Sequence, residues 1–370
     1  MIDWIVAERL AALLAGPGDA AAPASAPRLA EMAADAEKRV THYTGLTPSR
    51  PLPAPEAVDR REWIAANASS MGRMLGPVLE RAESRLRRAP TGGAARPAMS
   101  LAMSLVVTTE VGVVLGFLAQ RVLGQYELVL LEDPDPAHPP PTTEPRPPRL
   151  LFVLPNLGAA VESLEAPEDE FLTWVTLHEV THAVQFAGVP WLHGYLAGLV
   201  AALMRSAEVR IDAPSGLRLP SRAQLARSLR AARSGDVVGI FASPGERATL
   251  DRVQAAMAVV EGHAEHVMDA VAPDLLPSLA QLRSAMDRRR RSRSGLAQVL
   301  GRLLGMEMKL RQYEQGKAFC DAIVERAGAR ALRHLFSAPE ALPTLEEISD
   351  PGRWLARSGL DVQVLGATGP

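Results

Sequence analysis

The sequence contains a single cysteine, Cys320, among its 370 residues. One thiol excludes an intrachain disulfide, a CxxC motif and a cysteine-rich metal cluster, and it fits the reducing environment of the cytoplasm. Lysine is also scarce, with three residues against many arginines. The 42 acidic residues nearly balance the 40 Lys and Arg residues, so the formal net charge of −2 gives no electrostatic footprint for nucleic acid.

Long uninterrupted apolar segments are missing as well. Polar residues interrupt the apolar stretch 101–123, and the stretch 191–204 is shorter than a membrane span. We interpret both as buried helices of a soluble protein. The N-terminus has acidic residues where a signal peptide has basic ones, so the residues up to Leu14 predict an amphipathic helix that ends at Gly16. We therefore expect a cytoplasmic protein without a membrane or nucleic-acid partner.

Helical periodicity dominates what is present. Apolar residues at three- and four-residue spacing predict helices over residues 28–43 and 57–88. Residues 126–131 and 150–154 are short runs of strand character and predict a pair of strands. The second of these runs is also predicted to offer an edge for an extended peptide. The fold class expected from this pattern is α+β and predominantly helical.

The composition changes near Gly124 and again in a proline-rich stretch. We predict a helical region over residues 1–124 and a catalytic region over 125–370 that packs against it. Residues 133–149 include eight prolines, which exclude helix and sheet and predict an exposed loop of variable sequence.

A long helix is predicted from Pro167 to Phe186. Proline suits the first helical position, the acidic residues after it suit the positive end of the helix dipole, and Gly188 with Pro190 stops the helix. The sequence His-Glu-Val-Thr-His, residues 178–182, lies in its second half.

The spacing of the two histidines within this segment predicts a metal-binding site. Residues four apart on a helix lie about 40° apart in projection, so His178 and His182 can bind one cation together. Glu179 can accept a proton from a water molecule bound to that ion. The HExxH pattern therefore predicts a hydrolase with one Zn²⁺ ion, in which Glu179 assists the attack of zinc-bound water on the substrate.

A third protein ligand must come from elsewhere, and a second predicted helix, residues 249–271, supplies candidates. Glu261 and Glu265 share one face of it, so Glu261 can bind the metal while Glu265 orients a ligating histidine. Gly262, unusual in the middle of a helix, would allow another backbone to approach closely. The alternative ligands are Glu265, His266, His263 and His193.

Several segments along the chain can be compared with known families: residues 3–4, 15–18, 177–186, 261–269, 309–313 and 342–348. Together they resemble a family of zincin-like bacterial zinc metalloproteases that is largely uncharacterised, some members of which are labelled as associated with deazaflavin-coenzyme biosynthesis. The resemblance implies a zincin-like fold with a small sheet beside the HExxH helix. It also implies that Glu261 is the third ligand, because the glutamate zincins take that ligand from a Glu on a downstream helix.

The function predicted from these residues is that of a zinc metallopeptidase acting on a peptide or protein. Tyr313 is predicted to stabilise the oxyanion, with His266 and Arg311 as alternatives. Two other hypotheses are a zinc-stabilised binding or scaffold protein and a hydrolase of nonpeptide amides or esters. Cys320 has no catalytic signature around it and is predicted to be a buried structural thiol.

Overall fold

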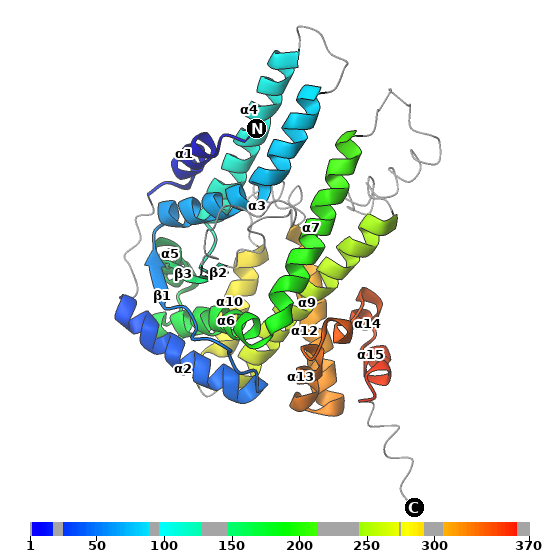
Figure 1. Cartoon of the computed structure of the whole chain (residues 1–370). Coiled ribbons are helices and arrows are strands. Elements are labelled where there is room, and N and C mark those ends of the chain that lie inside the picture. Colours follow the sequence, from blue (N-terminus) through cyan, green and yellow to red (C-terminus); the bar gives the residue numbers. More distant parts are fainter. Residues whose placement is uncertain are drawn as a thin grey trace, which may run out of the picture. The chain divides into compact units, whose positions relative to one another are not determined.

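The protein is represented by a computed structural model that describes residues 2–17, 25–88, 96–127, 147–212, 244–273, 275–291 and 306–360 (Figure 1). Helices dominate these residues and three short strands form one sheet, which confirms the α+β, predominantly helical fold. Most of the predicted proline-rich loop and the end of the predicted strand 126–131 lie outside the described residues.

Contacts divide the chain into two compact units. The first comprises Met1–Pro190 with Val267–Arg291, and the second comprises Trp191–His266 with Ser292–Pro370. The division of the sequence near Gly124 rests on composition, and it stays a prediction.

The first unit holds the sheet and the helices that pack on it. Its elements are α1 (Trp4–Ala15), α2 (Ala26–Thr44), β1 (Pro55–Val58), α3 (Arg60–Arg88), α4 (Arg96–Ala119), β2 (Gly124–Glu127), β3 (Arg149–Val153), α5 (Leu154–Leu164), α6 (Glu168–Gly188), the end of α9 (Pro244–Val271) and α10 (Leu279–Arg291). The HExxH helix is thus confirmed, with Pro167 as its N-cap. Strand β1 occupies residues where the apolar spacing predicted the start of a helix, and α3 begins only at Arg60.

The sheet has the order β1-β3-β2, with β1 parallel and β2 antiparallel to β3. The predicted pairing of two strands is confirmed by β2 and β3. The prediction that the strand at 150–154 offers an edge is wrong, because β3 lies in the middle. Residues Leu150 to Val153 are fully buried, as expected for a strand covered on both faces. The two edge strands are β1 and β2.

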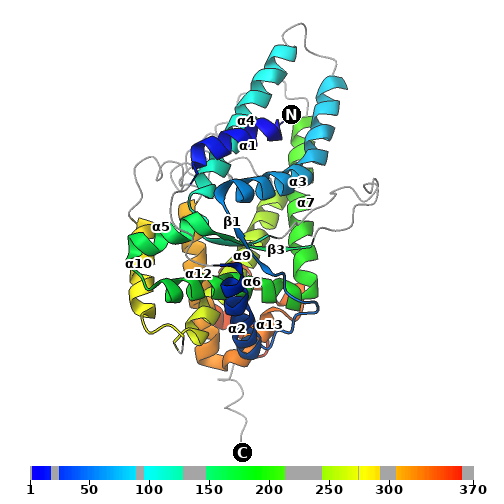
Figure 2. The same ribbon diagram turned by 90° about the vertical axis from the view of Figure 1, so that its left-hand side faces the viewer.

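Helices α3 and α6 lie on opposite faces of the sheet (Figure 2). Because successive side chains of a strand point to opposite faces, neighbouring residues of β2 contact different helices. The side chain of Gln125 accepts a hydrogen bond from Nε1 of Trp63 on α3 at 2.6 Å. Its neighbour Gly124 instead lies against Glu179 on α6. The core on the α3 side also includes α1 and α4, which contribute Ala11 and Leu115 among others.

Helix α1 confirms the predicted N-terminal helix and packs on α4. It ends at Gly16, which adopts φ +66°. Near the start of α4, Leu101 and Leu105 are 68% and 65% exposed. The prediction of a buried helix over 101–123 is therefore wrong for these residues, because α1 begins beside Thr108, whose hydroxyl accepts a hydrogen bond from the backbone N–H of Asp3.

No single helix in the described ranges is long and apolar enough to cross a membrane; α6 and α7 (Pro190–Asp212) pass that test only as a bent pair, on length and composition alone.

The second unit is helical in all its described parts. Its elements are most of α7 and of α9, α12 (Met306–Ala327), η1 (Ala329–Ala331), α13 (Leu332–Leu335), η2 (Pro339–Ala341), α14 (Leu345–Ser349) and α15 (Pro351–Arg357). Helices α9 and α12 touch backbone to backbone. A Cβ atom added to Gly262 would lie 2.1 Å from the carbonyl carbon of Gly316. The prediction that Gly262 allows a close approach is confirmed.

Candidate metal centre

The two histidines of the HExxH segment face each other one turn apart on α6. Their Nε2 atoms are 3.2 Å apart, and the ring planes are nearly perpendicular at 87°. Two nitrogens bound tetrahedrally to one zinc ion, each at about 2.0–2.1 Å, would lie about 3.3 Å apart. The spacing of His178 and His182 therefore fits two ligands of one ion.

The remaining ring nitrogens determine which tautomer each histidine adopts. Nδ1 of His178 lies 3.3 Å from the sulfur of Met268, and because a thioether can only accept a hydrogen bond, this nitrogen carries the hydrogen. Nδ1 of His182 lies 2.9 Å from Oε1 of Gln185 and donates to it. In these tautomers the Nε2 atom of each histidine offers its lone pair, so both can bind one cation.

A carboxylate completes a group of three possible ligands. His178, His182 and Glu261 each offer one ligand atom, and these atoms all lie within 4.8 Å of one another. Met268, which contacts His178, follows Glu261 by two turns of α9, so both residues share one face of that helix. Two imidazole nitrogens and one carboxylate oxygen are a ligand set typical of catalytic zinc. The residues present thus fit the ion that the sequence predicted.

The alternative ligands lie elsewhere in the described structure. His266 is held by a 2.6 Å contact between its Nδ1 and Asp321 of α12, and His263 is buried against the ring of Phe336. Glu265 and His193 are half-buried on α9 and α7. None of the four belongs to the group of three ligand atoms found among the described residues.

Two further residues were singled out in the sequence, Tyr313 as a donor to the oxyanion and Cys320 as a buried structural thiol. The side chain of Tyr313 lies outside the described part of the structure, so its role stays a prediction. Cys320 is fully buried, and burial raises the pKa of its thiol far above the ordinary value. A buried thiol that resists ionisation is a poor nucleophile, in agreement with the predicted structural role.

The carboxylate of Glu179 is fixed by β2. Its Oε2 accepts a hydrogen bond from the backbone N–H of Tyr126 at 3.0 Å, and a Cβ atom on Gly124 would lie 2.6 Å from its Cγ. Gly124 is therefore required for Glu179 to pack against the strand. The sequence marked Gly124 only as a boundary, since nothing local shows that two segments 55 positions apart will touch.

The outer edge of β2 faces Glu179. The carbonyl of Leu123 accepts a hydrogen bond from Val153 of β3. Backbone groups in an antiparallel strand alternate between its two sides. Gly124 and Tyr126 consequently direct theirs away from β3, which is why the Tyr126 amide reaches Glu179.

Gln185 was not predicted as part of the site, yet it orients His182. Its side chain is fully buried and accepts the Nδ1 hydrogen of His182. Residues that orient a metal ligand in this way typically contribute 10- to 100-fold to metal affinity. We expect Gln185→Ala to weaken zinc binding by about 10- to 100-fold, measured by competition with a chromogenic chelator. Gln185→Glu keeps an acceptor and serves as the control; equal losses in both variants would contradict this role.

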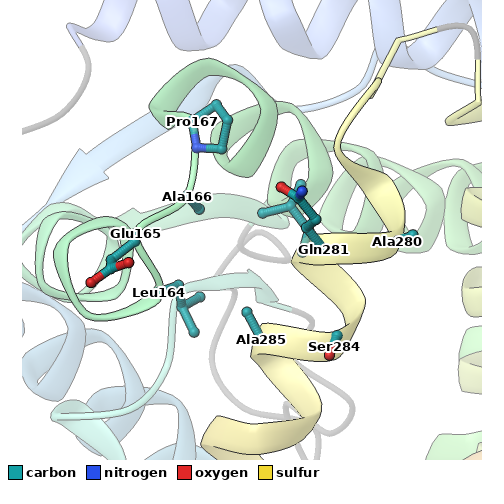
Figure 3. A pocket seen from close by; sticks show the side chains of 9 residues that line it. Leu164, Glu165, Ala166, Pro167, Ala280, Gln281, Ser284 and Ala285 are labelled. Atoms are coloured by element: carbon teal, nitrogen blue, oxygen red, sulfur yellow. The ribbon is translucent and has the colours of Figure 1, made fainter.

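A cavity of about 410 Å³ lies between the α5–α6 turn and α10, lined by Leu164, Pro167, Gln281 and Ala285 among others (Figure 3). Pro167 precedes His178 by three turns of α6, which is about 16 Å along the helix axis. The cavity lining includes none of the predicted site residues, so the cavity is separate from the metal centre.

Comparison with known proteins gives one family and one solved structure. Residues 2–355 match the model of the family described as zincin-like metallopeptidases. The chain is also similar to a crystal structure described as "a putative hydrolase with a novel fold" from Chloroflexus aurantiacus, at 31% sequence identity and a TM-score of 0.65. The similarity covers 96% of this chain and 98% of that one. No curated protein matches the sequence.

Proposed function

Because the chain belongs to the zincin-like metallopeptidase family, we propose that it is a zinc-dependent peptidase whose ion is held by His178, His182 and Glu261. The observation that carries this proposal is the group of His178, His182 and Glu261, whose possible ligand atoms all lie within 4.8 Å of one another. The hydrolase label of the similar solved structure supports the same class of reaction.

The roles of the side chains follow from where they are held. The bound zinc ion would polarise the scissile carbonyl and acidify the attacking water. Glu179 accepts the proton of that water and delivers it to the leaving amine. The Tyr126 amide holds one oxygen of the Glu179 carboxylate, so the side chain is oriented before substrate binds. Tyr313 remains the proposed donor to the developing oxyanion.

The outer edge of β2 supports a peptide as the substrate. Extended peptides bind exposed strand edges through main-chain hydrogen bonds. The Tyr126 amide is taken by Glu179, so a peptide would pair with the other outward backbone groups of β2. This pairing would bring the backbone carbonyls of the peptide beside Glu179. A nonpeptide amide or ester would gain nothing from this edge, which is our reason for preferring a peptide.

Removal and return of zinc test the enzyme against the scaffold hypothesis. We expect the purified protein to cleave members of a mixed peptide pool, to lose cleavage after dialysis against a chelator, and to regain it with one equivalent of Zn²⁺. Mass spectrometry of the pool identifies the bonds that are cut. Zinc binding without cleavage of any peptide would favour the scaffold, and turnover of an ester or small amide alone would favour the nonpeptide hydrolase.

A further inference from the structure

The connection between α2 and β1 carries an arginine that the reaction described above does not use. Arg50 is exposed, and within the described ranges no carboxylate forms an ion pair with it. An arginine of this kind offers a planar set of donors for a carboxylate from outside the chain.

This connection is fixed against the last turn of α6. The backbone N–H and the hydroxyl of Ser49 both donate to the carbonyl of Ala187, each at 2.9 Å. Gly188 adjoins the same connection, because a Cβ atom there would lie 3.3 Å from the Cβ of Leu46. Arg50, next in the chain after Ser49, is therefore held at the end of the HExxH helix.

Two stacked rings link Arg50 to the metal centre. Tyr126 of β2 packs on Phe186 of α6, with ring centroids 5.8 Å apart and planes inclined by 19°. Burial raises the pKa of the Tyr126 hydroxyl, and the Arg50 guanidinium beside that hydroxyl opposes the rise. The backbone of the same Tyr126 binds Glu179. The aromatic pair thus extends from the proposed general base to the guanidinium.

We propose that Arg50 forms a subsite for a carboxylate of the peptide substrate, with the Tyr126–Phe186 pair as its floor. Phe186 follows Glu179 by two turns of α6, about 10 Å, which an extended peptide covers with about three residues. The subsite therefore accepts a carboxylate two or three residues from the bond that is cut. This inference rests on the proposed function, since a peptide paired with β2 is what brings a carboxylate here.

A cation at the C-terminal end of α6 also interacts favourably with the helix dipole. That interaction would contribute to stability, and it would not distinguish one peptide from another. Preference among peptides is therefore the readout that separates a substrate subsite from a structural role.

The carboxylate can come from an Asp or Glu side chain or from the C-terminus of the peptide. Four pools of peptides of equal length separate these sources. Two pools contain Asp and Glu within the peptide, and two contain Asn and Gln instead. One pool of each kind has a free C-terminus and the other an amidated C-terminus. The pools are mixed with zinc-loaded Glu179→Gln protein, which we expect to bind substrate but to turn it over about 10²- to 10⁴-fold more slowly. Ultrafiltration and mass spectrometry give the bound fraction of each peptide.

We expect peptides with a carboxylate at the correct position to be retained about tenfold over their amide counterparts, with the preference reduced at high salt. Arg50→Glu removes the preference and Arg50→Lys keeps part of it. Arg9→Glu, the same charge reversal at an exposed site on α1, keeps all of it. Equal melting temperatures of the Arg50 and Arg9 variants exclude misfolding as the cause.

The subsite is overturned if the Glu179→Gln protein with Arg50 intact shows no preference for carboxylates. It is also overturned if the Arg50→Glu variant of that protein retains the preference in full. The same pools offered to the unmutated protein test the peptidase proposal separately. Carboxylate preference without cleavage would reject the peptidase and keep Arg50 as a peptide-binding residue, whereas cleavage without preference would reject only the subsite.

Discussion

Replacing Glu179 with Gln is expected to lower the rate of hydrolysis by about 10²- to 10⁴-fold while zinc content and melting temperature stay unchanged. Glutamine has the same size but cannot accept the proton of the attacking water. Its amide oxygen can still accept the hydrogen bond from the Tyr126 amide, which in the native protein is 3.0 Å long. Turnover per zinc-loaded protein, with zinc measured by mass spectrometry, checks the result.

Glu168→Gln provides the matched control for this substitution. Glu168 is an exposed acid in the first turn of the same helix, so the exchange removes one charge there without approaching the metal ligands. We expect its turnover to equal that of the unmutated protein. Unchanged turnover in Glu179→Gln would refute Glu179 as the general base, and loss of zinc from that variant would assign Glu179 a role in metal binding.

Replacing Gly262 with Ala is expected to destabilise the protein by about 3 kcal/mol or more, since its Cβ atom would enter the backbone of α12. The reverse contact is equally tight, because a Cβ atom on Gly316 would lie 1.9 Å from the carbonyl oxygen of Ala258. Two helices cannot relieve such overlaps by rotating a side chain, so their backbones must separate. Thermal unfolding monitored by circular dichroism should show a drop in melting temperature of about 4 °C or more.

The same substitution tests how the metal ligand is positioned. Glu261 directly precedes Gly262, so a shift of α9 should weaken zinc binding in the fraction that still folds. Gly198→Ala on α7 is the control, because no atom lies within 4 Å of a Cβ atom placed there. We expect it to be neutral or stabilising by up to about 1 kcal/mol. A Gly262→Ala protein as stable as Gly198→Ala would show that α9 and α12 are not in backbone contact.

The HExxH helix illustrates what could be predicted from local pattern. The position of His178 relative to His182 depends only on helix periodicity, and the ends of α6 follow from Pro167 and the residues after Phe186. Glu261 could be ranked first among its neighbours because its helix was also recognisable from local spacing. The local pattern of apolar residues does not show which strands pair. For that reason β1 was missed at the start of the helix predicted over 57–88, and β3 was predicted to be an edge strand although it lies between β1 and β2.

By itself, the sequence determined the helices, the pairing of two strands, the likeness to zincins and the two histidines one turn apart, because each depends on residues near one another in the chain. Only the tertiary structure decided that Glu261 joins His178 and His182 and that Gly124 and Tyr126 hold Glu179. It also decided that Gln185 orients His182 and that Arg50 adjoins the aromatic pair. These contacts depend on how separate elements pack, and packing is set by the shapes of many side chains at once.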